Sequence, residues 1–282
     1  MRVLTCGLFT LALCSGTQAL DLNLTAGLDT NPMLSKKPGS QMPVSMLAVG
    51  AHWGLFRDLS PNTGWSAAVA VEGQGFQNTT SLSQLSVEIG ITGHWQPTLG
   101  YRAPWYQASV QLTPVLVAND QRNTLDAALR ASRHQRLTDR IAYEAGLSFQ
   151  QAVAASSIFE HQRWGADGTA FYDFRAPRTP AFSSLFLSGT VLNGDFASAR
   201  GYNPGGIGYG YKQVDDGLSD DLDGNWWVYR TQGLAYSVSG GIRYTLTAQY
   251  ALDLFARHVA LNSADGDYSA QQIGVSFAAA LP

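Results

Sequence analysis

The most constraining feature of this chain is an alternation of apolar and polar residues, which recurs over residues 20–277 in stretches separated by turn residues. For example, Tyr143 and Leu147 share one parity, whereas Glu144 and Ser148 share the other. Because successive side chains of a β-strand point to opposite faces, each stretch predicts a strand with one apolar and one polar face. Strands of about ten residues are longer than most in soluble sheets and match the ~9–11 tilted residues of a bilayer crossing.

The N-terminus has the order of a secretory signal peptide: a basic start, a short apolar run and a small residue at the cleavage position. We predict that residues 1–19 are a signal peptide cleaved after Ala19 and that residues 20–282 form one mature domain. A lipoprotein signal with lipidation at Cys14 is the alternative. Cys6 and Cys14 are the only cysteines, so cleavage after Ala19 predicts a mature protein without disulfides or a cysteine-based metal site.

Composition favours a membrane-embedded barrel. Only 14% of the residues are charged, against roughly 25% in typical soluble domains, yet no stretch after the signal approaches the ~18 consecutive apolar residues of a membrane helix. We therefore predict an all-β chain: a single transmembrane antiparallel up-and-down β-barrel of about 12 strands, integral to the bacterial outer membrane. The net charge of −3 argues against a nucleic-acid partner.

Twelve strands account for the alternating stretches. An even count places both termini on the periplasmic side, so that odd-numbered connections are extracellular, and the two longest connections, residues 29–43 and 198–225, both fall there. Aromatic residues near strand ends, including Trp226 and Tyr268, are expected to form interfacial girdles. The strands are expected at Leu20–Leu28, Val44–Phe56, Gly64–Phe76, Leu82–Trp95, Ala103–Val117, Thr124–Arg136, Arg140–Val153, Arg163–Phe174, Ala181–Ala197, Trp226–Thr245, Tyr250–Leu261 and Tyr268–Phe277.

The polar parity collects charged side chains in the predicted strands. Because an Arg or Lys facing lipid at mid-bilayer costs ~2–4 kcal/mol, we expect these side chains to face the lumen. Two arrangements remain open: the charges line a wet pore, or they pair across a narrow lumen and fill it. The expected lumen-facing residues are Glu72, Glu88, Asp126, Arg130, Glu144, Arg163, Asp167, Asp173, Arg243, Asp253 and Arg257.

The long connection at residues 198–225 is the strongest candidate for a constriction or a ligand contact. Its second half is acidic, and Asp221, Asp223 and Gly224 are spaced like the start of a calcium loop. The position of the bidentate glutamate, however, is occupied by Arg230. Asp221 and Asp223 are therefore weak calcium candidates, and no other metal and no cofactor are predicted.

Catalysis finds little support in the sequence. The histidines are His52, His94, His134, His161 and His258, and none stands in a recognisable Ser-His-acid constellation. A Gly-x-Ser-x-Gly nucleophile elbow is also absent from the sequence. We therefore predict that the chain is not an enzyme and assign no catalytic residues.

The whole mature chain resembles porin-like bacterial outer-membrane β-barrels, and residues 27–32 (Gly-Leu-Asp-Thr-Asn-Pro) resemble the first hairpin of β-barrel porins and of surface-lipoprotein assembly modifiers. The resemblance implies insertion by the barrel-assembly machinery, contact with outer-membrane lipid and lipopolysaccharide, and a small solute as partner. The expected function is a narrow channel for small solutes. The alternatives are a largely closed barrel acting as an envelope scaffold, assembly or surface-interaction protein, and an outer-membrane lipid hydrolase.

Overall fold

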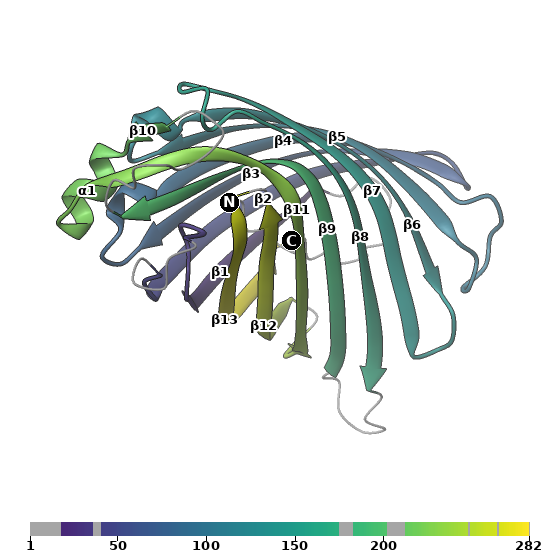
Figure 1. The fold of residues 1–282 in the computed structure, drawn as a ribbon. Helices are drawn as coiled ribbons and strands as arrows, with labels where there is room; N and C mark the ends of the chain where they lie inside the picture. Colours follow the sequence, from purple (N-terminus) through teal and green to yellow (C-terminus); the bar gives the residue numbers. More distant parts are fainter. Residues whose placement is uncertain are drawn as a thin grey trace.

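The computed structural model describes residues 18–35, 41–174, 183–201, 212–247, 249–263 and 265–281, and it shows a closed antiparallel barrel (Figure 1). The sheet has thirteen strands, and removing the short β10 (Lys212–Val214) leaves twelve wall strands. Each wall strand pairs with its neighbours in chain order, and β13 pairs with β1 to close the ring. The predicted up-and-down barrel of twelve strands is therefore confirmed. The wall strands are β1 (Gln18–Asp29), β2 (Val44–Ser60), β3 (Thr63–Phe76), β4 (Gln84–Trp95), β5 (Trp105–Val117), β6 (Thr124–Arg136), β7 (Ile141–Ala154), β8 (His161–Phe174), β9 (Ser183–Gly201), β11 (Trp226–Thr245), β12 (Tyr250–Ser263) and β13 (Gly266–Leu281).

Several strand ends differ from the prediction. β4 begins at Gln84 rather than Leu82, because residues 80–82 form the short 3₁₀ helix η2 (Thr80–Leu82). β9 continues to Gly201 and β13 to Leu281, since each keeps a paired neighbour over that length. The predicted signal peptide, including Cys6 and Cys14, lies outside the described residues except for residues 18 and 19, which belong to β1.

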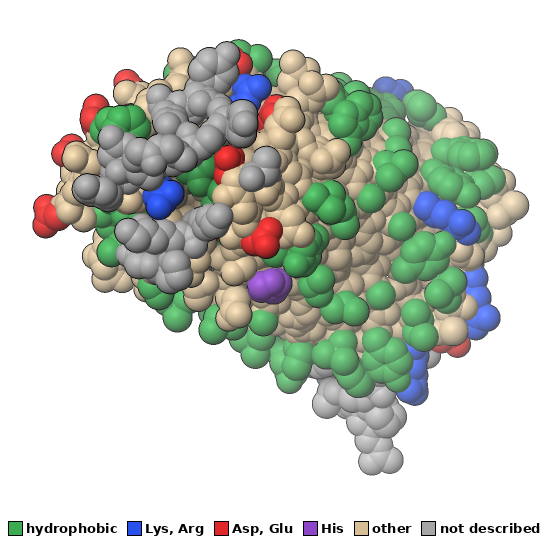
Figure 2. Space-filling view, in the orientation of Figure 1, with side chains coloured by type: hydrophobic (Ala, Val, Ile, Leu, Met, Phe, Trp, Pro, Cys, Tyr) green, Lys and Arg blue, Asp and Glu red, His purple; other side chains and the backbone are tan. Residues whose placement is uncertain are grey.

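The wall has an apolar outer face. On β6, Leu125 and Leu129 are about half exposed, whereas Asp126 and Ser132 on the other parity are buried. The same alternation runs around the ring, and Figure 2 shows hydrophobic side chains spread over the wall, with charged side chains mostly toward its two ends. Such an extended apolar surface on a closed barrel requires hydrocarbon as its solvent. The protein is thus integral to the outer membrane.

The end of the barrel that carries the long connections is elaborated. It holds η2, a second 3₁₀ helix η3 (Asp120–Arg122), β10 and the helix α1 (Asp216–Leu222), which lies at the left of Figure 1. No helix among the described residues is long and apolar enough to cross a membrane.

The β9–β11 hairpin extends beyond the rest of the wall. β8 stops pairing with β9 at Gly194, and β12 stops pairing with β11 at Gly233. Gly194 has φ of +146°, and a Cβ there would collide with the carbonyl of Gln162, so glycine is required where the hairpin leaves the wall. Beyond this point β10 pairs with the edge of β11 that β12 leaves unpaired. The prediction that residues 198–225 form one loop is therefore wrong, because the hairpin occupies part of it.

Two hydrophobic clusters lie at this extended hairpin rather than in a central core. One joins Leu34 to the inner face of β9 and β11–β13, including Phe196, Tyr229, Leu261 and Tyr268. The other joins α1 to the hairpin and to residues of the β1–β2 and β7–β8 connections, namely Met33, Ile158, Phe159, Ala199, Leu218, Trp226 and Val228. The buried apolar packing of the protein thus concentrates at the extracellular mouth.

Candidate functional site

Residues 212–225, which we call the strap, cross the mouth of the barrel. The strap connects to the wall through β11, and its helix α1 contacts η2, in the connection between β3 and β4. In the ring order, four strands separate the β3–β4 pair from the β9–β11 pair in one direction (β5 to β8) and four in the other (β12, β13, β1 and β2). The two attachment points are therefore on opposite sides of the ring, and the extended hairpin and the strap together reach from one side of the mouth to the other.

Asp215 is the first anchor of the strap. Its carboxylate is fully buried and caps α1 by accepting a hydrogen bond from the Leu218 amide at 3.0 Å. The same carboxylate accepts from Asn119 Nδ2 at 2.7 Å, and from Arg122 Nε at 2.9 Å and Nη2 at 2.5 Å. Burial lowers the pKa of Arg122 from its usual value, and the nearby Asp215 charge opposes that shift. A buried ion pair, in which two guanidinium nitrogens donate to the same carboxylate oxygen, therefore ties the strap to the β5–β6 connection.

Asp221 is the second anchor. Its carboxylate accepts from the Ser81 amide at 2.7 Å and from Thr80 Oγ1 at 2.9 Å, both in the β3–β4 connection. The other calcium candidate, Asp223, is the C-cap of α1 with φ of +48°. Asp221 and Asp223, whose spacing suggested a calcium loop, thus belong to the helix α1 and its C-cap. The described residues contain no group of three or more His, Cys, Asp or Glu side chains placed to hold a metal.

The β1–β2 connection also lies at the mouth. Asn31 Nδ2 donates to the carbonyls of Ser35 and Ser269, each at 2.9 Å, and Asn31 Oδ1 accepts from the Ser35 amide. Ser198 Oγ donates to the Leu34 carbonyl at 2.5 Å, which holds the connection against β9. Together with the strap, this connection narrows the mouth on the side of β9 to β13.

The predicted lumen-facing charges all fall on the parity opposite the exposed apolar residues, and several form ion pairs between strands. Arg130 pairs with Glu144 at 2.5 Å and with Asp167 at 2.6 Å, on the next two strands. Two further ion pairs are Arg136–Asp173 at 2.5 Å and Arg243–Asp253 at 2.8 Å. Two arginines make hydrogen bonds instead: Arg163 Nε donates to the Asp195 carbonyl at 2.6 Å, and Arg257 Nη2 donates to Ser237 Oγ at 3.3 Å. Glu72 and Glu88 lie on the adjacent strands β3 and β4, and Asp126 is buried on β6.

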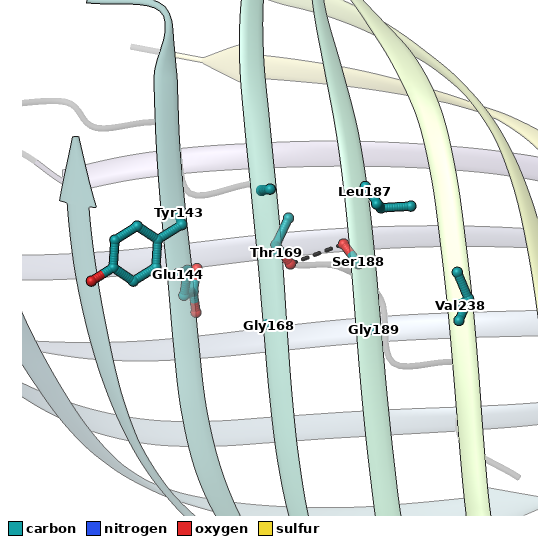
Figure 3. A pocket seen from close by; sticks show the side chains of 9 residues that line it. Tyr143, Glu144, Gly168, Thr169, Leu187, Ser188, Gly189 and Val238 are labelled. Carbon is teal, nitrogen blue, oxygen red and sulfur yellow. Dashed lines mark hydrogen bonds between the residues drawn. The ribbon is translucent and has the colours of Figure 1, made fainter. Parts of the chain in front are cut away.

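A row of polar residues follows the inner wall from strand to strand. His134, Glu144, Thr169 and Ser188 are successive cross-strand partners on β6 to β9. Figure 3 shows part of this row, with the hydrogen bond of 2.9 Å between Thr169 Oγ1 and Ser188 Oγ. The row continues through Ser239, Arg257 and Gln272 to Asp29 on β1. A hydrogen-bonding surface therefore lines much of the lumen's circumference.

Water reaches the lumen from the end opposite the strap. Asp21 and His52 lie on the inner parity of β1 and β2, with Asp21 Oδ2 at 3.7 Å from His52 Nδ1. Their side chains are nevertheless 35% and 47% exposed, respectively. The exposure of these two inner-face side chains shows that solvent enters the lumen at its periplasmic end.

Two aromatic assignments are wrong. Trp226 is 5% exposed and Tyr268 is 2% exposed, and both belong to the clusters at the mouth rather than to a lipid-facing girdle. The Tyr268 hydroxyl is 2.7 Å from the Tyr229 hydroxyl. Position at a strand end suggested the girdle, but the extended hairpin and the β1–β2 connection cover these rings.

No protein-family model and no curated protein matches this sequence. Among solved structures, the COG4313 outer membrane channel from Pseudomonas putida F1 has a TM-score of 0.60 at 12% identity, covering 96% of this chain and 97% of that chain. The fold is that of an outer-membrane β-barrel. The barrel also matches the NanC porin (TM-score 0.44, 9% identity, 91% of this chain and 98% of that one) and LpxR from Salmonella typhimurium (0.41, 12%, 91% and 99%). The predicted resemblance to outer-membrane β-barrels is confirmed at the level of the fold.

Proposed function

We propose that this barrel is a channel for small solutes whose extracellular mouth is constricted by the strap. The observation that carries the proposal is a solvent-accessible lumen lined by ion pairs and narrowed at one end by a segment that two anchors hold across the mouth. The fold similarity to the Pseudomonas putida channel supports it. A scaffold that needed only a closed barrel would gain nothing from hydrated charges in its interior.

The lumen favours small polar solutes without a strong preference for one sign of charge. Arg130, Arg136 and Arg243 each lie against a carboxylate, so these cations are largely neutralised locally. Hydroxyl groups such as those of Thr169 and Ser188 between the pairs can exchange hydrogen bonds with a passing solute. We propose neutral or zwitterionic polar molecules as the cargo.

The remaining partners follow from the surface. Outer-membrane lipid and lipopolysaccharide surround the apolar wall, and the barrel-assembly machinery inserts it. A lipid-hydrolysing site would need a base at the lipid-facing surface, and His258, which is exposed there, has Val238 and Gln271 as its cross-strand neighbours. We therefore rank lipid hydrolysis below transport.

Planar-bilayer recording of the refolded protein tests the channel. The comparison is between the wild type and a variant in which residues 212–225 are replaced by a short Gly-Ser linker. We expect discrete conductance steps in the wild type and larger steps in the variant, because the constriction is gone. A variant with a shortened periplasmic turn at residues 97–101 serves as the control and should keep wild-type steps. Silence in both the wild type and the strap variant would overturn the proposal.

A further inference from the structure

Three side chains on the inner wall have the arrangement of an activated nucleophile. Ser132 and His134 lie two residues apart on the inner parity of β6, and Glu144 is the direct cross-strand partner of His134 on β7. Ser132 Oγ is 3.0 Å from His134 Nε2, and His134 Nδ1 is 3.4 Å from Glu144 Oε2. A proton on Nδ1, facing the carboxylate, leaves Nε2 to accept the hydroxyl proton of Ser132. This is the order nucleophile, base and orienting acid.

The imidazole is fixed in this position from its other side as well. Trp105, the cross-strand partner of His134 on β5, stacks on the ring with centroids 3.7 Å apart and planes 7° from parallel. Stacking on one neighbour and pairing with another leaves the ring little rotational freedom. The base is therefore held toward Ser132.

A group that can stabilise a developing oxyanion lies beside Ser132. Gly146 lies opposite Ser132 on β7, and a Cβ at this glycine would be 3.0 Å from Arg130 Nη2. The guanidinium therefore covers the position next to Ser132, and glycine gives it room. Arg130 also pairs with Glu144 and Asp167, so its guanidinium is held in place beside the nucleophile. A fixed cation next to Ser132 supplies the electrostatic part of an acyl-transfer site.

We propose that Ser132, His134 and Glu144 form a catalytic site that hydrolyses small carboxylic esters entering the lumen. Ser132 Oγ attacks the ester carbonyl carbon while its proton passes to His134 Nε2. The bond to the leaving alcohol breaks as His134 returns that proton to the alcohol oxygen, which leaves an acyl group on Ser132. Water, deprotonated by His134, then releases the carboxylic acid and restores the serine. Glu144 holds the imidazole and stabilises its cationic form.

The surroundings define the size of the substrate. Ser132 is 7% exposed, so only a short acyl chain can reach it. The site lies near the end of β6 at Arg136, away from the strap, on the side where the lumen is open to solvent. The proposed activity goes beyond transport and differs from the sequence-based expectation that the chain is not an enzyme.

The test uses the full mature chain refolded in detergent, a fluorophosphonate probe and p-nitrophenyl acetate. We expect the probe to label Ser132, as mapped by mass spectrometry, and Ser132→Ala to abolish both labelling and hydrolysis. His134→Gln should lower the hydrolysis rate by roughly 10²–10⁴-fold, the usual contribution of a general base. Ser109→Ala, in an inward-facing serine on β5, is the matched control and should retain wild-type rates.

Two further measurements keep the outcome unambiguous. Circular dichroism and heat-dependent gel mobility establish that each variant is folded, and bilayer recording of Ser132→Ala should give wild-type conductance, which separates this proposal from the channel. Absence of labelling in the folded wild type, or equal hydrolysis by Ser132→Ala, would overturn the proposed site.

Discussion

Asp215 is a single side chain that anchors the strap at the mouth, where the buried apolar packing of the protein concentrates. Its carboxylate is fully buried and neutralises Arg122, whose side chain is only 16% exposed. Removing one partner of a buried ion pair is costly, about 3–5 kcal/mol, because the other charge remains without compensation. The neighbouring Asp216 lies on the same helix but is exposed. Its substitution by Asn removes the same charge as the substitution of Asp215 but affects no buried ion pair.

We therefore expect Asp215→Asn to release the strap and Asp216→Asn to leave it in place. Amide hydrogen exchange of α1 should accelerate by two or more orders of magnitude in the first variant only, with wall strands unchanged. Similar exchange in the two variants would show that the ion pair does not hold the strap.

The placement of single residues also marks the limit of what the sequence could predict. Parity alone put Arg130, Glu144 and Asp167 on one face, because a strand has a fixed period of two. It could not bring Ser132, His134 and Glu144 together, since their contact depends on the register of the β6–β7 hairpin, and a slip of one residue would place Glu144 on the outer face. The hydrogen bond from Asn31 to the Ser269 carbonyl could not be predicted either, because the two residues are 238 positions apart in the sequence.

At the scale of elements, the strap is a short helix that depends on close approach to its neighbours. Gly217 in α1 faces the β3–β4 and β5–β6 connections, where a Cβ would lie 2.8 Å from Ser81 Cβ and 3.1 Å from Asn119 Nδ2. Gly224, at the other end of the strap, would have no atom within 4 Å of an added Cβ. The strap therefore contains one glycine that its packing requires and one that it does not.

This difference predicts opposite outcomes for the same substitution. Gly217→Ala should push α1 away from η2, raise single-channel conductance and speed protease cleavage within the strap several-fold, whereas Gly224→Ala should match the wild type in both measurements. If both variants behaved alike, the seating of α1 on η2 would not determine the constriction.

The kind of secondary structure also explains why the wall strands could be predicted from the sequence and the structure of the mouth could not. A wall strand repeats one local pattern, so each could be recognised from its own residues, with errors of a few positions at the ends. The strap has no such period, and α1, β10 and the extended hairpin are held by tertiary contacts such as those of Asp215 and Leu218. Trp226 was misplaced for the same reason, because only the hairpin's extension beyond the wall takes it out of the lipid-facing surface.

For the whole molecule, the assignment of faces requires that the outward-facing side chains of the wall contact membrane hydrocarbon. Arg133 indicates where that contact ends. This arginine is exposed on the outer parity of β6, with its guanidinium 5.9 Å from the centre of the Tyr143 ring and donating to Gln135 Oε1 at 2.8 Å. A cation stacked on an interfacial tyrosine is typical of the headgroup level. Leu129, one outward position deeper than Ala131, should then lie within the hydrocarbon, and Leu137, in the β6–β7 turn, should lie outside it.

An arginine scan across this boundary tests the lipid-facing surface directly. Leu129→Arg should destabilise the barrel by ~2–4 kcal/mol in urea titrations of the protein in phospholipid vesicles, whereas Leu137→Arg should cost only ~0–1 kcal/mol, because the penalty for a charge depends on depth. Both leucines are about half exposed, so the two variants change similar surfaces and differ in what surrounds them. Equal penalties at the two positions would mean that the outer parity of β6 does not face hydrocarbon, and the assignment of inner and outer faces would fail around the whole ring.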